Sequence, residues 1–418
     1  MSANDNIPHD QKLDNSITLI QEGYLFIKNR INRYQSDIFK ARILGQNVIC
    51  MSGENAAKVF YDPKRFTRKG AAPYRIQQSL FGVGAIQTLD DQEHRHRKKL
   101  FLPYMEIADQ KRLGKIVKEE WEKAITKKNK KEINIFEEAG ILLCRVACNW
   151  VGVPVEASKV SVLAEDFIAM VYAFGAIGPR HWKGRRARNK VENWLEELVK
   201  AVRNGKIEIN KDSIMYSFTF HRDLDGNLLD NRMVAIEIMN ILRPIVAIST
   251  YITFMILALH EHPEHVELLR IGTEEDLEAF VEEVRRFYPF GPFLAARVKE
   301  DFEWNDCTFN KGTLVLLDVY GTNHDNRIWE DANHFNPRNF HKRTENKYNF
   351  IPQGGGDPSS GHRCPGEGIT VEVMKSTLDF FVNQVKYEVP AQDLSYPLNE
   401  MPTLPKSGFI ISNVALTK

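Results

Sequence analysis

The sequence predicts a mainly α-helical protein with small peripheral β-sheets, an α+β architecture. Amphipathic helical periods recur along most of the chain, and the longest, residues 231–261, would span roughly 45 Å at 1.5 Å per residue. Short segments with strand-like alternation occur near the two ends of the chain. No Pro/Gly/Ser-rich linker and no internal repeat divides the sequence, so residues 1–418 are expected to form a single domain.

The expected elements follow one another in a regular order. Residues 14–34 have a helical period, and residues 37–51 alternate around a Gly-Gln-Asn turn, which predicts a hairpin. Further helices are expected at 92–102, 109–127, 135–151, 158–174, 187–204, 231–261 and 274–288. Short strands are then expected at 294–300, 306–309 and 313–318, followed by a helix at 366–384 and a strand pair at 387–390 and 408–416. The long helix is expected to be capped by Asp230 or Asn231 and to stop before Pro263.

The composition is that of a globular protein without charge-driven partners. The 418 residues are 43% hydrophobic, and 56 basic residues against 55 acidic ones give a net charge of +1. This balance predicts no general attraction to nucleic acid or to acidic membranes. The basic run "KGRRARNK" at 183–190 is therefore expected to be a solvated helix end or turn.

The cysteine content and the N-terminal segment indicate a cytoplasmic protein. Five cysteines, an odd number at scattered spacings, argue against a disulfide framework and for a reducing compartment. Cys144 and Cys148 lie one helical turn apart in an apolar setting and are expected in the core. The N-terminal segment is polar and has no signal-peptide pattern, and no run of about 18 apolar residues predicts a membrane span.

The glycine-rich stretch 350–370, "FIPQGGGDPSSGHRCPGEGIT", is the most informative motif in the chain. Glycine permits positive φ and close backbone approach, and a helix that begins after Cys364 directs its N–H groups toward the sulfur, which favours thiolate. Such a thiolate suits either a nucleophile paired with a distant histidine or a metal ligand. A phosphate-binding loop is disfavoured because the Gly-Lys-Ser/Thr ending is missing, and a plain turn with an incidental cysteine is the simplest alternative.

This loop resembles the haem-binding loop of the cytochrome P-450 superfamily, with Cys364 followed by Gly366. Phe350 lies fourteen residues before Cys364, a longer interval than in the usual family pattern. Glu283 and Arg286 in "EEVRR" resemble the superfamily's Glu-x-x-Arg pair. The segments "TNHDNRIWEDANHFNPRNF" (322–340) and "QEHRHRKKLF" (92–101) also match in order.

The resemblance implies a single haem-thiolate domain, with the haem between the long central helix and the cysteine loop. It implies a b-type haem whose iron is bound by the thiolate of Cys364, an axial ligand that favours O–O bond cleavage. The residues expected to contact the haem propionates are His94, Lys98, His362 and, as a weaker candidate, Arg68. Arg338 is expected to meet the structural pair Glu283 and Arg286.

Arg243 and Pro244 interrupt the apolar stripe of the long helix, in "EIMNILRPIVAIST" (237–250). A proline inside a helix costs about 3 kcal/mol, and a buried guanidinium costs several kcal/mol more unless an anion meets it. The neighbours of Arg243 at i±3 and i±4 are Met239, Asn240, Val246 and Ala247, so the helix supplies no carboxylate. Arg243 therefore pairs with a distant acid or a haem propionate, or else it receives the carboxylate of a ligand.

The Arg243–Pro244 pair and the long cysteine loop together resemble the bacterial fatty-acid peroxygenases and fatty-acid decarboxylases. The pair replaces the acid and the alcohol of ordinary superfamily members, and Thr250, about two turns further on, is no obvious substitute. The resemblance implies that the carboxylate of a long-chain fatty acid binds Arg243 and acts as the acid–base group. Hydrogen peroxide is then the co-substrate and no redox partner is required. The expected reaction is hydroxylation at the α or β carbon, and the alternative is decarboxylation to a terminal alkene.

Position 87 discriminates within this branch. Alkene-forming members tend to carry histidine where this sequence has Gln87, and glutamine is more typical of β-hydroxylating members. Gln87 is therefore expected to favour hydroxylation, because glutamine does not titrate as histidine does. Phe81 and Phe290 are expected to line an apolar channel for the acyl chain. Two other functions remain open at this stage, a reductase-dependent monooxygenase and a haem sensor or fatty-acid-binding protein without catalysis.

Overall fold

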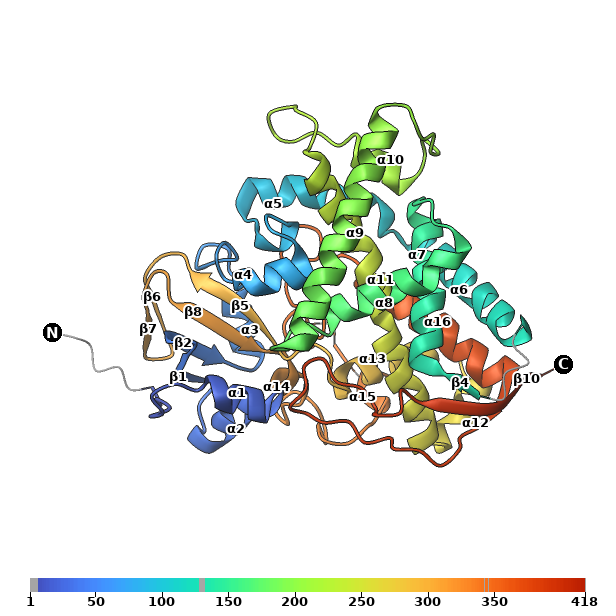
Figure 1. The fold of residues 1–418 in the computed structure, drawn as a ribbon. Coiled ribbons are helices and arrows are strands. Elements are labelled where there is room, and N and C mark those ends of the chain that lie inside the picture. Colours follow the sequence, from blue (N-terminus) through green and yellow to red (C-terminus); the bar gives the residue numbers. More distant parts are fainter. Residues whose placement is uncertain (1–6, 128–131, 342, 345, 418) are drawn as a thin grey trace.

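The computed structural model describes residues 7–127, 132–341, 343–344 and 346–417. Most helices form one large body, and the five-stranded sheet lies to one side of it (Figure 1). The prediction of a mainly helical fold with small sheets is confirmed.

The α-helices range from single turns to the 31-residue α11. They are α1 (Ser16–Glu22), α2 (Leu25–Tyr34), α3 (Glu54–Phe60), α4 (Tyr74–Ile76), α5 (Asp91–Lys98), α6 (Ile107–Lys127), α7 (Ile135–Val151), α8 (Val160–Val171), α9 (Pro179–Arg203), α10 (Ile214–Thr219), α11 (Asn231–Glu261), α12 (Glu264–Ile271), α13 (Glu274–Phe287), α14 (Val319–Asn323), α15 (Arg338–His341) and α16 (Glu367–Gln384). A π-helical turn, η1 (Gln77–Phe81), and three 3₁₀ turns, η2 (Ile86–Thr88), η3 (Leu102–Tyr104) and η4 (Ala157–Lys159), complete the helical elements.

The strands are β1 (Ile38–Ile43), β2 (Gln46–Met51), β3 (Phe66–Thr67), β4 (Glu132–Asn134), β5 (Phe293–Val298), β6 (Phe302–Trp304), β7 (Cys307–Phe309), β8 (Leu314–Asp318), β9 (Val385–Glu388) and β10 (Ile410–Leu416). The largest sheet has the order β1-β2-β8-β5-β3, and β4, β10 and β9 form a second sheet. The expected hairpin is present, and its two-residue loop is Leu44-Gly45, where both residues have positive φ. The expected C-terminal pair, β9 and β10, is antiparallel.

The helix α11 is the central element of the core. The side chain of Asp230 accepts hydrogen bonds from the N–H groups of Arg232 and Met233, so the expected cap and first residue are correct. The helix continues through Pro244 to Glu261. It is long and apolar enough to cross a bilayer, yet 94% of its most apolar window is buried inside the fold. Its composition is therefore that of a core helix.

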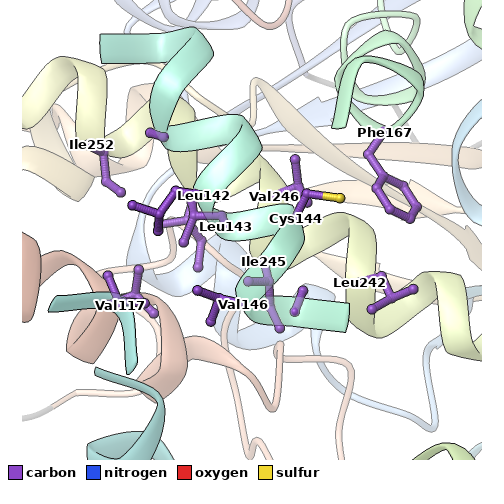
Figure 2. Close-up of a cluster of buried hydrophobic side chains, with 14 of the residues drawn as sticks. Val117, Leu142, Leu143, Cys144, Val146, Phe167, Leu242, Ile245, Val246 and Ile252 are labelled. Carbon is purple, nitrogen blue, oxygen red and sulfur yellow. The ribbon is translucent and has the colours of Figure 1, made fainter. Parts of the chain in front are cut away.

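The packing of α7 against α11 explains the expected burial of Cys144 and Cys148. Both cysteines are fully buried. Figure 2 shows Cys144 within a cluster that includes Leu142 and Val146 from α7 and Ile245 and Val246 from α11. The two thiols therefore fill core volume between helices.

The helix α9 departs most from the sequence expectation, because it begins at Pro179 and not at residue 187. Proline suits a first helical turn, where its missing N–H has no intrahelical role. The basic run 183–190 consequently lies inside the helix, and the expectation of a solvated helix end is wrong for Arg188, whose side chain is 1% exposed.

The pair formed by Glu283 and Arg286 in α13 ties the helical body to the segment before the cysteine loop. Arg286 Nε and Nη2 donate to the Glu283 carboxylate, each at 2.6 Å. Arg286 Nη1 donates to the carbonyls of Asn323 and Ala332 at 2.9 and 2.8 Å. Both side chains are fully buried, so this pair fixes two irregular segments from inside.

The expectation that Arg338 joins this pair is wrong. Arg338 is exposed at the start of α15, and no hydrogen bond links its guanidinium to Glu283 within the part of the chain that the structure describes. The backbone N–H of Asn336 instead donates to Glu283 Oε1 at 2.6 Å. Arg286 and this N–H already satisfy the carboxylate, so it needs no second arginine.

Removing Glu283 should destabilise the fold strongly, because it leaves the buried Arg286 without its counter-ion. We expect Glu283→Ala to lower the free energy of unfolding by about 3–5 kcal/mol in urea denaturation followed by circular dichroism. The control is Glu156→Ala, which breaks an ion pair with Lys159 whose side chains are 68% and 67% exposed. The control should change the free energy by less than about 0.5 kcal/mol. A Glu283→Ala effect as small as the control's would contradict the structural role of the pair.

Candidate active site

A cavity of about 950 Å³, including its open mouth, lies between α11 and the cysteine loop. Its lining combines residues from α5, α11, α16, η2 and the loop before α16. The lining residues with a bearing on its chemistry are Gln87, His94, Lys98, Asn240, Pro244, Gln353, His362 and Cys364. The cavity therefore unites the two motifs that the sequence singled out, the Arg-Pro helix and the cysteine loop.

The cysteine loop is shaped for a sulfur ligand. Gly354 has φ of 98°, and a Cβ there would lie 2.8 Å from the Tyr61 hydroxyl oxygen, so the turn requires glycine. Gln353 Nε2 donates toward Cys364 Sγ at 3.8 Å, and the N–H of Gly366 is also directed at this sulfur. Burial raises the pKa of the Cys364 thiol, whereas these donors favour thiolate. A cation bound to the sulfur would complete the stabilisation.

Arg285 and Glu367 support this loop from α13 and α16, and sequence reasoning did not identify them. Arg285 Nη2 donates to Gln353 Oε1 at 2.8 Å and also binds the Glu367 carboxylate. Arg363, next to the cysteine, donates from Nε to Glu367 at 2.6 Å. Arg285 lies beside the paired Arg286, and only the folded chain reveals that the two arginines serve different partners.

Three of the residues expected at the haem propionates, His94, Lys98 and His362, line the cavity, whereas Arg68 lines an adjoining cavity that also includes His94 and His362. The rings of His94 and His362 lie 4.1 Å apart, and His362 Nε2 lies 3.3 Å from Asp90 Oδ1. Burial, together with the charges on His362 and Lys98, lowers the pKa of His94 to about 3. Lys98 donates to the carbonyls of Gly361 and Arg363, so it also holds the cysteine loop.

Among the four expected propionate contacts, Arg68 is a buried cation that still lacks an ion-pair partner in the described chain. Its guanidinium is buried over the ring of Phe60, with 4.4 Å between Cζ and the ring centroid. Within the described ranges it forms no side-chain hydrogen bond and no ion pair. Burial lowers the pKa of Arg68, and a carboxylate would reverse this penalty. The donor set of Cys364, Lys98 and Arg68 thus fits a metal-bearing group that carries acidic substituents.

Arg243 is not itself among the residues that line the cavity, but it lies on α11 next to the lining residue Pro244 and three residues after Asn240, and it is only 5% exposed. Its Nη1 donates to the carbonyl of Leu80 in η1. No carboxylate of the described chain pairs with it, and its other nitrogens make no hydrogen bond there. Burial, together with repulsion by Arg188, lowers the pKa of Arg243 to about 9. The guanidinium therefore stays protonated at neutral pH and keeps one edge open for an anion.

Glu237 organises the polar groups of the cavity wall, and sequence reasoning missed it. This fully buried carboxylate accepts from Arg97 Nη1 at 2.7 Å, from the Ile86 N–H at 3.0 Å and from Asn240 Nδ2 at 3.0 Å. The bonds join α5, η2 and α11. Gln87 follows Ile86 directly, and the amide oxygens of Gln87 and Asn240 are buried without a donor among the described residues. They are available to a ligand that brings O–H groups.

Three further residues that the sequence singled out do not line the cavity. Phe81 and Phe290 are not among the residues that line it. Phe290 packs against Tyr251, with 4.7 Å between ring centroids, and η1 ends at Phe81. Their expected role in an acyl channel stays a prediction. Thr250 lies 3.2 Å from the Tyr172 hydroxyl and does not line the cavity, in agreement with the expectation that it is no substitute for the missing alcohol.

Known proteins resemble this chain in sequence and in fold. The family model for cytochrome P-450 matches residues 275–412. A structure of cytochrome P450EX alpha (CYP152N1) with myristic acid is 43% identical, covers 98% of this chain and 99% of its own, and has a TM-score of 0.95. This chain belongs to the cytochrome P-450 family. The identity over nearly the whole length places it in the CYP152 branch, as the motifs predicted, and makes it an oxidoreductase.

More distant similarity agrees with this assignment. Cytochrome P450SP alpha (CYP152B1), solved with ibuprofen, is 40% identical, covers 96% of this chain and 99% of its own, and has a TM-score of 0.93. A variant of the cytochrome P-450 OleT, solved with arachidonic acid, is 35% identical, covers 99% of both chains and has a TM-score of 0.96. Cytochrome P-450 85A1 from Solanum lycopersicum is 23% identical over 415 residues, 91% of this chain and 86% of its own. Membership of the family implies a haem whose iron is bound by a cysteine thiolate.

The contact of Gln353 with the sulfur predicts a measurable electronic effect. In the haem-loaded protein, Gln353→Leu should remove an N–H donor and increase electron donation by the thiolate. A bond worth about 1 kcal/mol corresponds to a reduction potential about 40 mV lower, measured by spectroelectrochemical titration. Ser359→Ala, at an exposed position of the same loop, should leave the potential unchanged. An unchanged potential in Gln353→Leu would show that this donor does not act on the sulfur.

Proposed function

We propose that this protein hydroxylates long-chain fatty acids at the α or β carbon with hydrogen peroxide. The observation that carries this proposal is Arg243, a buried cation on the cavity helix without a carboxylate partner in the described chain. Two structures of similar proteins, CYP152N1 and OleT, were solved with myristic acid and arachidonic acid. A fatty-acid carboxylate is the anion that would meet the open edge of this guanidinium.

The residues of this chain would hold the haem and support its chemistry. Cys364 would bind the iron as thiolate, and His94, Lys98, His362 and Arg68 would interact with the acidic substituents of the haem. The bound haem supplies peroxide activation and oxygen transfer. We propose that these residues and the substrate site form one domain, because the largest buried cluster includes residues from Leu100 to Ile411. We also propose that the enzyme acts in the bacterial cytoplasm.

Arg243 would have two roles in the reaction. Its free edge binds the carboxylate in a bidentate manner and restricts the reacting carbons to those next to the head group, which is worth several kcal/mol of barrier. The residues that α11 contributes to the cavity wall are one amide, Asn240, and apolar side chains, with no acid among them. The bound carboxylate would therefore be the group that accepts a proton from peroxide and returns it to the leaving oxygen. In the net reaction, a C–H bond and hydrogen peroxide are converted to an alcohol and water. A reductase is therefore not required.

Decarboxylation is the second candidate reaction on the same site. The acid and peroxide would give a terminal alkene, carbon dioxide and two molecules of water. The observation that favours hydroxylation is Gln87, which lines the cavity where alkene-forming relatives tend to carry histidine. Glutamine leaves the wall without a titrating group at this position.

The central test is turnover without a reductase. We expect the haem-loaded protein to convert myristic acid and peroxide to α- or β-hydroxymyristate, identified by gas chromatography with mass spectrometry. Arg243→Leu should lower kcat/KM by about a hundredfold or more, since it removes charged hydrogen bonds. Methyl myristate is the substrate control and should not react. An ester that reacts as readily as the acid would refute the role of the carboxylate.

A second experiment tests Gln87. We expect Gln87→His to raise the fraction of terminal alkene among the products of myristic acid, because an imidazole can exchange a proton near the reacting carbons. Gln87→Asn, which keeps an amide, serves as the control. The same product ratio in the parent protein, Gln87→His and Gln87→Asn would show that Gln87 does not determine the choice between hydroxylation and decarboxylation.

A further inference from the structure

A second buried arginine lies next to Arg243. Arg188, from the basic run in α9, donates from Nη1 to the carbonyl of Leu80 at 2.6 Å, and this is the oxygen that also accepts from Arg243. Arg188 is 1% exposed. Two guanidinium groups from different helices therefore converge on one backbone oxygen.

The Leu80 carbonyl is available to both arginines because of where it lies. It belongs to the last turn of η1, where carbonyls lack an intrahelical donor. The chain then turns at Gly82, which has φ of 97°. A Cβ at Gly82 would lie 2.5 Å from Arg188 Nη2, so the turn is packed directly on Arg188. Arg188 thus holds both the carbonyl and the turn that follows it.

The charges around this carbonyl are unbalanced. Arg188 Nε lies 3.1 Å from the Glu192 carboxylate, and Arg232 Nε lies 2.7 Å from the same group. The nearby Glu237 carboxylate attracts both Arg188 and Arg243, but its ion pair is with Arg97. Four guanidinium groups, those of Arg97, Arg188, Arg232 and Arg243, therefore face two carboxylates, Glu192 and Glu237, among the described residues. Arg232 is exposed, whereas Arg188 and Arg243 are buried, and two adjacent buried cations favour the binding of an anion.

We propose that Arg188 is a positioning residue of the carboxylate site. It fixes the Leu80 carbonyl, which in turn holds one nitrogen of Arg243 and leaves the opposite edge free, and its charge strengthens the binding of the substrate carboxylate. This inference rests on the proposed function, in which Arg243 binds that carboxylate. A purely structural role for Arg188, as a tie between α9 and η1, is the competing explanation.

Binding measurements on the haem-loaded full chain distinguish the two explanations. Isothermal titration calorimetry with myristate and with tetradecanol compares an anionic and a neutral head group on the same acyl chain. We expect Arg188→Met to raise the Kd for myristate at least tenfold and to leave the Kd for tetradecanol within about twofold. Arg188→Lys keeps the charge and a donor and should recover most of the lost affinity. Arg186→Met, at an exposed position of the same run, is the matched control and should change neither constant.

Three results would overturn the inference: an unchanged Kd for myristate in Arg188→Met, an equal loss for tetradecanol, or no recovery in Arg188→Lys. If Arg188→Met does not fold, Glu192→Gln replaces it. Removing that carboxylate should tighten myristate binding, and weaker binding would count against the inference. Arg243→Leu is measured alongside, because an unchanged Kd for myristate there contradicts the proposed function itself, whereas a loss in Arg243→Leu alone contradicts only the role of Arg188.

Discussion

A buried positive charge without a counter-ion is the constraint around which this site is arranged. Removing a guanidinium from water costs several kcal/mol, and a single backbone carbonyl repays only part of this cost. Arg243 tolerates the deficit because nearly every residue of α11 around it is buried, so the helix backbone cannot move to carry the side chain to solvent. The free edge of the guanidinium remains inside the fold, and an anion that reaches it forms the charged hydrogen bonds that no carboxylate of the described chain provides.

Cations that bind backbone carbonyls recur throughout the molecule. Arg243 and Arg188 hold Leu80, Lys98 holds Gly361 and Arg363, and Arg286 holds Asn323 and Ala332. Each of these carbonyls lies in an irregular segment or at a helix end, where the backbone lacks its own donor. Loops that contain few apolar residues are thus fixed from within by charge-assisted hydrogen bonds. The end of η1 next to Arg243 and the cysteine loop are therefore held by the same kind of contact.

The sequence predicted the parts of this arrangement that depend on local pattern. The limits of α11 and the helix that follows Cys364 follow from periodicity and capping, whereas the buried pairing of Glu283 with Arg286 was expected from the family resemblance. The contacts it missed join residues far apart in the chain. Arg188 resembles its exposed neighbours in a basic run, and only the longer α9 turns it inward. Glu237 stands near Arg243 in sequence, yet two of its three partners come from α5 and η2. The prediction for Arg338 was wrong because the backbone N–H of Asn336 already donates to the Glu283 carboxylate that Arg338 was expected to contact.

Because α11 both lines the cavity and forms part of the core, changing the substrate specificity of this enzyme by mutation would also affect its stability. Ile241, Ile245 and Ile248 line the cavity and also belong to the main hydrophobic core, as do residues on the other sides of the same helix. Replacing these isoleucines with smaller residues to admit bulkier substrates would therefore lower thermal stability as well as selectivity. Directed evolution should begin from a variant that has first been stabilised at distant surface positions, so that the loss can be tolerated.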